Sequence, residues 1–301
     1  MKLVISASPH IDSGATTRKI MGDVLIALCP ALIAAVIIFG WRALLVTAVC
    51  AAACVFFEWG FEKLCHKPST IDDLSAVVTG VILAYNLPGS IPLWQAVFGC
   101  LVAIVAVKQL FGGIGKNFAN PALVGRIVLF LSFSKTMTAW VFPDAVSSAT
   151  PLAQLAAGQK PELWTLLLGN HGGCIGETCA LALLLGGAYL LLRGVITWQT
   201  PVCFVGTVFV LSLILGQDAM RQILSGGLLL GAFFMATDYV TAPQTCWGRA
   251  LFGIGAGLLT CLIRFYGSYA EGVSFAILFM NILTPYLSKW TRSKPLGGVP
   301  A

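Results

Sequence analysis

The chain has 301 residues, of which 58% are hydrophobic and only 10% are charged, whereas an ordinary soluble domain carries about 25% charged residues. So few charged side chains cannot cover a folded surface, which excludes a water-soluble globular protein and a disordered chain. The 32 glycines follow no fixed period, which excludes a collagen-like chain. The formal net charge is +6, but Lys and Arg form no clustered patch, so we expect no nucleic-acid partner.

Apolar segments dominate the rest of the sequence. The first 21 residues are of mixed polarity and lack the apolar core and cleavage site of a signal peptide. Ten apolar segments follow, several of them shorter than the roughly 20 residues that a straight membrane-spanning helix needs. We therefore predict an all-α polytopic membrane protein with about ten transmembrane helices, some of them short or broken. The segments are Val24–Trp41, Ala43–Phe61, Leu74–Leu87, Ile91–Val107, Pro121–Ser134, Ile175–Leu192, Pro201–Leu215, Ile223–Thr237, Ala250–Ile263 and Val273–Leu287.

The ten cysteines and three histidines have no metal-site spacing. The closest cysteine pairs, Cys50 with Cys54 and Cys174 with Cys179, do not match the CxxC pattern of zinc or redox sites. Most cysteines lie in apolar runs and are interpreted as small buried hydrophobic side chains. Cys174 and Cys179 flank a loop end, where a disulfide is expected only if the loop faces an oxidising compartment.

The distribution of Lys and Arg predicts the orientation in the membrane. With ten spans and the N-terminus inside, the inside loops hold 12 of the 18 basic residues, which places both termini in the cytoplasm. The remaining six are Arg42, Arg126, Lys135, Lys160, Arg221 and Arg264. The longest stretch without an apolar segment, residues 135–174, then lies outside the cell.

The two halves of the chain resemble each other. Gly80 and Gly231, like Pro92 and Pro243, are 151 residues apart. Five spans in each half imply an inverted repeat, and such repeats place short, broken helices at a central site; the alternative is that two glycine-rich helices look alike by composition. We predict an N-terminal segment over 1–21, five-helix repeats over 22–134 and 175–288, an extracytoplasmic loop over 135–174, and a cytoplasmic tail over 289–301.

Ionisable residues inside spans are candidates for function, because unpaired charge in a bilayer is costly. Arg126 and Glu177 flank the outer loop and are positioned to pair with each other or to bind an anion, Glu58 is expected at the membrane interface, and Asp238 stands where a helix breaks. A purely structural ion pair is an equally good interpretation of each of these four residues. We expect the polar side chains at the broken helices to converge and to line a flavin pocket or an ion path: Asn86, Asn120, Glu177 and Asp238.

A basic, glycine-rich loop runs from Lys108 to Pro121, where a helix is expected to start. Glycine permits close approach of the backbone, and helix N-termini attract anions. The loop matches no phosphate-binding fingerprint, because no buried strand precedes it. It predicts only that a polar or anionic group lies near Lys116 and Asn120.

The string from Asp144 to Ala153 is the most specific in the sequence. Ser147, Ser148 and Thr150 alone would be interpreted as a turn or a helix cap. However, the string resembles the Asp-x-x-Ser/Thr-Gly/Ser-Ala-Thr motif of a family that includes the D-type membrane subunit of the Rnf ion-translocating ferredoxin:NAD oxidoreductase and the B-type membrane subunit of the sodium-pumping NADH:quinone oxidoreductase. Ser148 stands where glycine is common in that motif. Further landmarks of the family occur in order: 8–10, 20–31, 111–123, 175–182 and 233–243.

The resemblance, which covers nearly the whole chain, implies a cofactor and partners. A flavin transferase would attach FMN through a phosphoester to Thr150, within a flavinylation motif formed by Asp144, Ser147, Ser148 and Ala149. The chain would then be an electron-transfer subunit of an ion-translocating oxidoreductase in the bacterial inner membrane, without a complete active site of its own. It would assemble with other membrane and peripheral subunits, contact lipid, and couple electron flow to Na⁺ or H⁺; a second, non-covalent flavin such as riboflavin is a further possibility that the resemblance leaves open. The length of the chain favours the Rnf relative.

Two other classes of protein fit part of the sequence. Ten spans, an inverted repeat and broken helices also suit a channel or transporter without redox chemistry, and the family fold is similar to urea-transporter-like proteins. A structural membrane subunit is the third reading. Thr150 within its motif separates them, because a pore or a scaffold has no need of that motif.

Overall fold

The computed structural model describes residues 15–140, 149–267 and 271–292. These ranges fold into helices joined by short connections, and the one strand-like pairing in them is an isolated antiparallel bridge between Pro88 and Cys174. The elements are α1 (Thr17–Phe39), α2 (Trp41–Leu64), η1 (Ile71–Asp73), α3 (Ser75–Tyr85), α4 (Leu93–Leu101), η2 (Val102–Gln109), α5 (Pro121–Ser132), α6 (Ser134–Met137), α7 (Pro151–Ala156), α8 (Leu163–Leu168), α9 (Ala180–Leu192), α10 (Gln199–Ile214), α11 (Ala219–Leu224), α12 (Leu228–Leu230), η3 (Gly231–Met235), α13 (Cys246–Tyr266) and α14 (Val273–Trp290).

Each of the ten predicted apolar segments contains helix, but two are less regular than expected. Residues 175–179 of the sixth segment form a buried loop, in which the Ile175 amide donates to the Leu87 carbonyl and the Gly176 amide donates to the Tyr85 carbonyl, both at 2.9 Å. Only glycine fits at 176, because a Cβ there would lie 2.2 Å from the Tyr85 Cβ. The eighth segment is divided among α11, α12 and η3, with Gly226 at a φ of +67° between α11 and α12.

Helices also extend into the predicted non-spanning regions. α1 begins at Thr17, within the expected N-terminal segment, because the Thr16 hydroxyl accepts from the Lys19 amide and caps the helix. The stretch 135–174, expected as a loop, contains most of α6 and all of α7 and α8. Proline at the first position of α7 explains part of this, because its fixed φ suits the start of a helix.

The surface of the molecule suits lipid. Three helices in the described ranges, α1, α2 and α13, are long and apolar enough to cross a membrane, and five shorter apolar helices accompany them. Large apolar side chains such as Ile37, Phe56 and Leu192 are well exposed on these helices, whereas soluble proteins rarely expose large apolar patches. The backbone groups are hydrogen-bonded within helices, as a bilayer requires. The chain is therefore a helical membrane protein.

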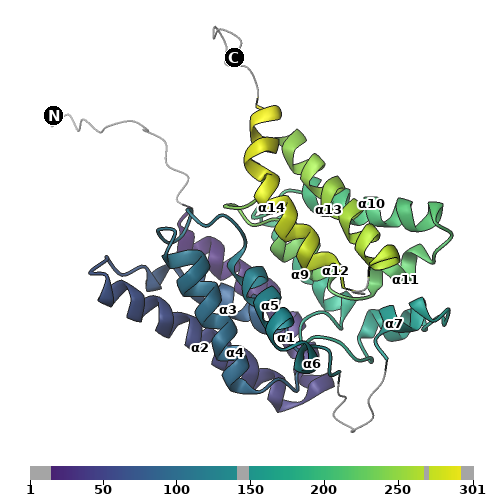
Figure 1. The fold of residues 1–301 in the computed structure, drawn as a ribbon, viewed down its shortest axis with the longest axis horizontal. Coiled ribbons are helices and arrows are strands. Elements are labelled where there is room, and N and C mark those ends of the chain that lie inside the picture. The colour runs from purple at the N-terminus through teal and green to yellow at the C-terminus, as the bar shows by residue number, and fades with distance from the viewer. Residues whose placement is uncertain (1–14, 141–148, 268–270, 293–301) are drawn as a thin grey trace, which may run out of the picture.

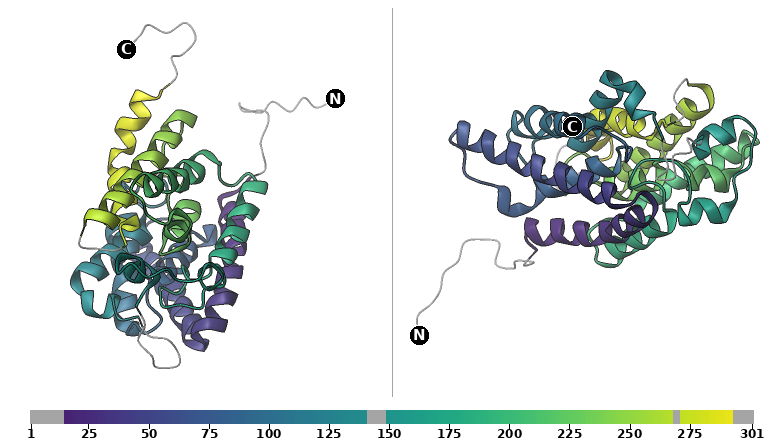
Figure 2. Two further views of the ribbon diagram at one scale, coloured as in Figure 1. Left: turned by 90° about the vertical axis from the view of Figure 1, so that its right-hand side faces the viewer. Right: turned by 90° about the horizontal axis from the view of Figure 1, so that it is seen from below.

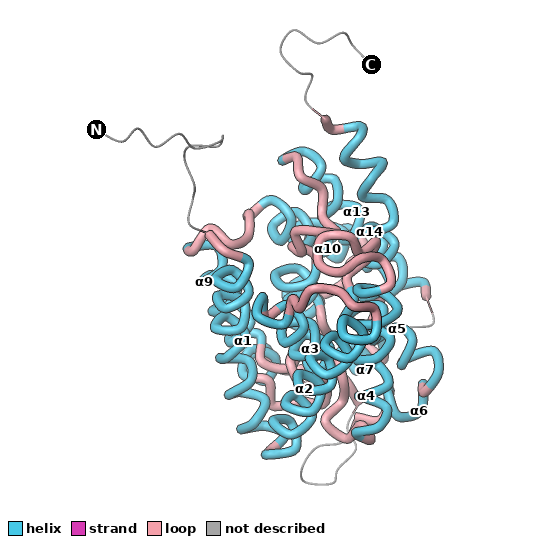
Figure 3. Tube along the Cα trace, turned by 90° about the vertical axis from the view of Figure 1, so that its left-hand side faces the viewer, coloured by secondary structure: helices cyan, strands magenta, loops and turns pink. Residues whose placement is uncertain are grey.

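The N-terminal helices α1–α5 and the C-terminal helices α9–α14 occupy different sides of the molecule (Figure 1). Across their boundary α1 packs against α9 and α5 packs against α14. Gly186 permits the first contact, since a Cβ on it would lie 2.1 Å from the Ala27 carbonyl oxygen. The start of α1 and the end of α14 lie at the same end of the molecule (Figures 1 and 2), and α6 and α7 lie toward the other end (Figure 3).

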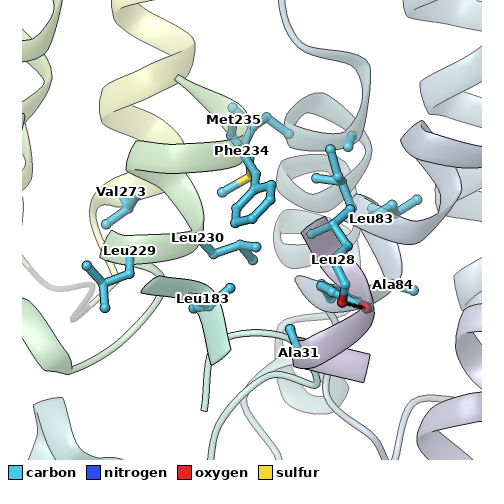
Figure 4. Close-up of a cluster of buried hydrophobic side chains, with 14 of the residues drawn as sticks. Leu28, Ala31, Leu83, Ala84, Leu183, Leu229, Leu230, Phe234, Met235 and Val273 are labelled. Atoms are coloured by element: carbon cyan, nitrogen blue, oxygen red, sulfur yellow. Dashed lines mark hydrogen bonds between the residues drawn. The ribbon is translucent and has the colours of Figure 1, made fainter. Parts of the chain in front are cut away.

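The centre of the core lies where the two sets of helices meet (Figure 4). Leu28 of α1 and Leu83 of α3 face Leu183 of α9 and Phe234 of η3, and all four are buried. The Tyr85 hydroxyl donates to the Leu28 carbonyl at 2.8 Å and ties the end of α3 to α1. This packing fixes the broken helices α3 and η3 against each other and so positions the polar residues at their ends.

Candidate functional site

A cavity of about 290 Å³ lies among α1, α3, α5, α9 and η3, close to the lower end of the usual range for ligand pockets. Most of its wall is apolar, formed by residues such as Ile20, Val24, Ile82 and Phe233. A few polar side chains interrupt this wall, an arrangement that is typical of sites for flat organic ligands. They are Thr17, Ser75, Thr79, Lys108, Asn117, Asn120, Thr237, Asp238 and Tyr239.

Behind this cavity the ends of the two broken helices meet at Met235. The Asn86 side-chain amide donates to the Ile82 carbonyl at 2.7 Å and to the Met235 sulfur at 3.4 Å. The Asn120 amide donates to the Met235 carbonyl, also at 3.4 Å. The Asn86 Oδ1 is buried without a hydrogen-bond partner within the described part of the chain. The structure thus brings together Asn86 and Asn120, which the sequence analysis expected to converge.

The glycine-rich loop delivers Asn120 to the cavity. Gly112, Gly113 and Gly115 have φ values of +115°, +93° and +87°, in the region that side chains disfavour. Asn120 caps α5, its Oδ1 accepting from the Ala122 amide at 3.1 Å. Lys116 is exposed and does not line the cavity.

Asp238 also lines the cavity, three residues beyond Met235. Its carboxylate accepts from the Val240 amide at 3.4 Å and from the Thr241 hydroxyl at 3.0 Å. The break in the helix therefore leaves a carboxyl group beside the cavity, with local donors to satisfy it.

Arg126 and Glu177 lie in a second cluster, away from the cavity wall. The Arg126 guanidinium contacts Glu271 and Ser274 and lies 3.9 Å from the Cys174 sulfur. Glu177 accepts from the Cys174 amide at 3.0 Å through Oε1, while its buried Oε2 has no partner in the described ranges. Arg126 therefore pairs with Glu271, and Glu177 joins the same cluster through Cys174. The Cys174 sulfur and one carboxylate oxygen each of Glu177 and Glu271, atoms of the kind that bind metal ions, lie within 4.8 Å of one another.

The sequence analysis missed Glu271 because it lies in a connection between helices, where a lone carboxylate gives no signal. The disulfide left open between Cys174 and Cys179 is absent, because all ten cysteines are free. Cys174 is instead buried at the bridge with Pro88.

Glu58, expected at the membrane interface, is buried inside the protein. Its side chain is fully buried, and both carboxylate oxygens accept from Lys108 Nζ at 2.8 Å. The Gln109 amide and the Thr70 hydroxyl also donate to it, at 3.0 Å each. Lys108 was assigned to an inside loop but lies in η2, a π-helical turn, and π-helical turns often occur at functional sites. The pairing joins residues 50 positions apart, which local patterns do not reveal.

Thr150 stands at the N-cap of α7. Its hydroxyl accepts from the Ala153 amide at 3.3 Å, and its side chain is partly exposed. Ala149 is exposed, and its carbonyl accepts from the Gln154 side chain at 3.2 Å. Asp144, Ser147 and Ser148 lie outside the described residues. The Thr150 oxygen is therefore near the surface and already serves as a hydrogen-bond acceptor.

Comparison with known proteins identifies the family. A model of the NQR2, RnfD, RnfE family matches residues 4–297, almost the whole chain. This chain belongs to that family. It is 46% identical to the D-type subunit of the Na⁺-translocating ferredoxin:NAD⁺ oxidoreductase complex of Acetobacterium woodii, over 99% of this chain and 96% of the relative. It is 41% identical to the D-type subunit of the proton-translocating complex of Clostridium ljungdahlii, over 97% and 96%.

A third relative, the D-type subunit of the ion-translocating oxidoreductase complex of Actinobacillus succinogenes, is 34% identical over 97% of each chain. The resemblance inferred from the motifs is confirmed, because all three relatives are named as D-type subunits of such complexes. By their names, they are components of redox enzyme complexes that move ions. Two of these names specify different ions, Na⁺ in one and protons in the other.

Proposed function

We infer that this chain is the D-type membrane subunit of an ion-translocating ferredoxin:NAD⁺ oxidoreductase complex and that it carries electrons on FMN bound covalently to Thr150. The similarity to D-type subunits over nearly the full length supports the complex. The position of Thr150 supports the attachment site, since a transferase needs an accessible hydroxyl. After esterification the side-chain oxygen is still able to accept from Ala153, so α7 keeps its cap.

Thr150 and its neighbours would hold the FMN, which supplies the redox chemistry when it is bound. The chain itself supplies a tether, because a phosphoester keeps the cofactor attached through every cycle. α7 fixes the position of the tether relative to α11 and α12, since a Cβ on Gly226 would lie 2.7 Å from the Leu152 side chain. Asp144, Ser147, Ser148 and Ala149 complete the flavinylation motif that a transferase would recognise.

The cavity beside Asn117 and Asn120 suits a second, non-covalent flavin such as riboflavin. Its wall is largely apolar, as an isoalloxazine face requires, and its few amides and hydroxyls match the polar edge of the ring. Asn120 and Asp238 would hold and orient the group there. Asn86, Arg126 and Glu177 lie outside this wall; they would line an ion path for Na⁺ or H⁺ instead, and exposed Lys116 would contact another subunit.

The arrangement of the helices supports an inverted repeat of two five-helix units. The first unit comprises α1, α2, α3, α4 with η2, and α5; the second comprises α9, α10, α11 to η3, α13 and α14. The first helices of the two units contact each other, and so do the last, which is the pairing that a two-fold axis in the membrane plane would produce. With both termini in the cytoplasm, as the distribution of Lys and Arg favours, Thr150 would lie on the outer side of the inner membrane.

Flavin fluorescence on a denaturing gel tests the proposal. The chain is co-expressed with the transferase as wild type, as Thr150→Ala and as Thr138→Ala, which removes another exposed hydroxyl. We expect a fluorescent band and an FMN-modified peptide from the wild type and Thr138→Ala, and neither from Thr150→Ala. Electron flow through the assembled complex should stop only in Thr150→Ala. Full electron transfer by that variant would overturn the proposal and favour a channel or transporter without redox chemistry.

A further inference from the structure

Two buried carboxylates on α2 share one hydroxyl. Glu58 and Glu62 are one helical turn apart, with 0% and 3% of their area exposed. The Thr70 hydroxyl lies 3.0 Å from Glu58 Oε1 and in short contact with Glu62 Oε1. A hydroxyl carries one proton and so donates to one carboxylate at a time. The second contact is a hydrogen bond only if the carboxyl on that side carries a proton.

The charges around this pair identify the side that carries the proton. Glu58 accepts from Lys108, Gln109 and Thr70, as an ionised carboxylate does. Glu62 has only Thr70, whose amide lies 3.2 Å from each of its oxygens. One ammonium group thus faces two buried carboxylates, and a buried unpaired charge is costly. A proton on Glu62 removes this cost and completes the hydrogen bond to the Thr70 hydroxyl.

The other titratable groups nearby do not supply the missing positive charge. Asp73 of η1 is another carboxylate, and it accepts from the Ser75 amide at 2.7 Å. Lys67 donates to the Gln109 carbonyl at 3.3 Å and lies over the Phe61 ring. Lys63, in the last turn of α2, and His66, just beyond its end, are exposed. The array therefore has solvent near Glu62 at one end.

The other end of the array reaches the cavity. Lys108 Nζ donates to the Ser75 hydroxyl at 2.6 Å as well as to Glu58, and the Ser75 hydroxyl donates its own proton to Asp73. Both Lys108 and Ser75 belong to the cavity wall. Hydrogen-bonded groups therefore run without a gap from Glu62 through Thr70 and Glu58 to Lys108 at the cavity wall.

We propose that Glu62, Thr70 and Glu58 hold one exchangeable proton and that Lys108 passes it to the occupant of the cavity. The delivery step rests on the proposed flavin in the cavity, whereas the shared proton does not. Two-electron reduction of an isoalloxazine to its anionic reduced form takes up one proton. Lys108 would give that proton to the occupant of the cavity. Glu58 would then return to Lys108 the proton that it receives from Glu62 through Thr70, and water would reprotonate Glu62. The electrons come from the electron donor of the complex.

Infrared spectroscopy tests the shared proton without any flavin chemistry. The wild-type protein should show the carbonyl band of a protonated carboxyl group, and Glu62→Gln should lose it. Glu162→Gln, the same substitution at an exposed site, should keep it. Thr70→Val should shift the band to higher frequency because the carboxyl loses its acceptor, and Thr70→Ser should not. The shared proton would be overturned by a spectrum without the band or by a band that is unchanged in Glu62→Gln. It would also be overturned if the band appeared only after Na⁺ is removed, because the carboxylates would then hold Na⁺ in place of the proton.

Stopped-flow proton uptake tests the delivery step in the assembled complex. With a pH dye in the medium, Thr70→Val should slow proton uptake during flavin reduction by roughly tenfold or more, while Thr70→Ser stays near wild type. Electron arrival should be unchanged in both. Uptake at the wild-type rate in Thr70→Val overturns delivery through Thr70. If denaturation of the protein releases no non-covalent flavin, the proposed flavin in the cavity and the delivery of a proton to it are both overturned. The infrared band still tests whether Glu62 and Glu58 share a proton.

Discussion

The Asn86 side chain and the Met235 sulfur are 3.4 Å apart although 149 residues separate them in the chain. Asn86 ends α3, and Met235 is the last residue of η3. Both helices end inside the molecule, and the Asn86 amide at the end of α3 donates a hydrogen bond to the Met235 sulfur at the end of η3. A helix that ends inside a membrane protein leaves backbone and side-chain groups that only the protein can satisfy. The contact between these two ends places the polar side chains of Asn86 and Asn120 inside an apolar fold.

Close packing of α1 on α9 depends on Gly186. Gly186→Ala should destabilise the protein by about 1–3 kcal/mol, because its Cβ would collide with the Ala27 carbonyl. Gly206→Ala is the matched control on α10, where no atom lies within 4 Å of the added Cβ. That change should be neutral or stabilising by up to about 1 kcal/mol, since alanine favours helix. Thermal unfolding in detergent measures both, and equal effects would contradict the tight contact.

The ion pair between Arg126 and Glu271 should be strongly coupled. Arg126→Met leaves the Glu271 carboxylate without its partner and should cost about 3 kcal/mol. Glu271→Met should cost a similar amount. The double variant should cost less than the sum, because it leaves neither charge alone. A double-mutant cycle of detergent unfolding gives the coupling energy, and strictly additive effects would argue against the pair.

Asn120 has two tasks that substitutions can separate. Asn120→Ser keeps an oxygen to cap α5 but loses the amide that donates to the Met235 carbonyl. Its stability should be near wild type, whereas Asn120→Leu should lose about 1 kcal/mol through the missing cap. Both should retain less non-covalent flavin. Unfolding curves measure the cap, and flavin released on denaturation measures the cavity; full flavin content in both variants would remove Asn120 from the proposed site.

Labelling from one side of the membrane tests the orientation. Gln159 follows α7 and is exposed, and Cys65 is an exposed native thiol at the other predicted face. A membrane-impermeant thiol reagent added outside intact cells should label Gln159→Cys in a background that lacks the exposed native cysteines Cys29, Cys65 and Cys246. In a second background that keeps only Cys65 of these three, the same reagent should reach Cys65 only in inverted vesicles. The reverse pattern would overturn both the topology and the outer location of Thr150.

Thr150→Ser tests how strictly the attachment site is read. Serine keeps the hydroxyl and the cap of α7, so the protein should insert and unfold as the wild type does, within about 0.5 kcal/mol. It should carry less covalent FMN, because the missing methyl group leaves the hydroxyl with more rotamers. Peptide mass spectrometry gives the modified fraction. Complete modification would mean that the transferase reads only the hydroxyl.

The sequence by itself determined the class of the protein and the position of its helices. Apolar runs must leave water, so each of the ten segments from Val24 to Leu287 contains helix in the structure. Broken helices were foreseen at Asn86 and Asp238, because glycine, proline and polar residues interrupt the apolar runs there. Local chemistry is sufficient for these features. The covalent FMN that the motif around Thr150 implies stays a prediction.

Only the tertiary structure decided which charged groups pair. Glu58 was expected near Lys63 at the interface, yet it binds Lys108, 50 residues away. Arg126 was expected near Glu177, yet its direct partner is Glu271, 145 residues away. A buried charge needs an opposite charge or several donors, but any helix that folds against it can provide them. The packing of α2 on η2, and of α5 on α14, makes that choice.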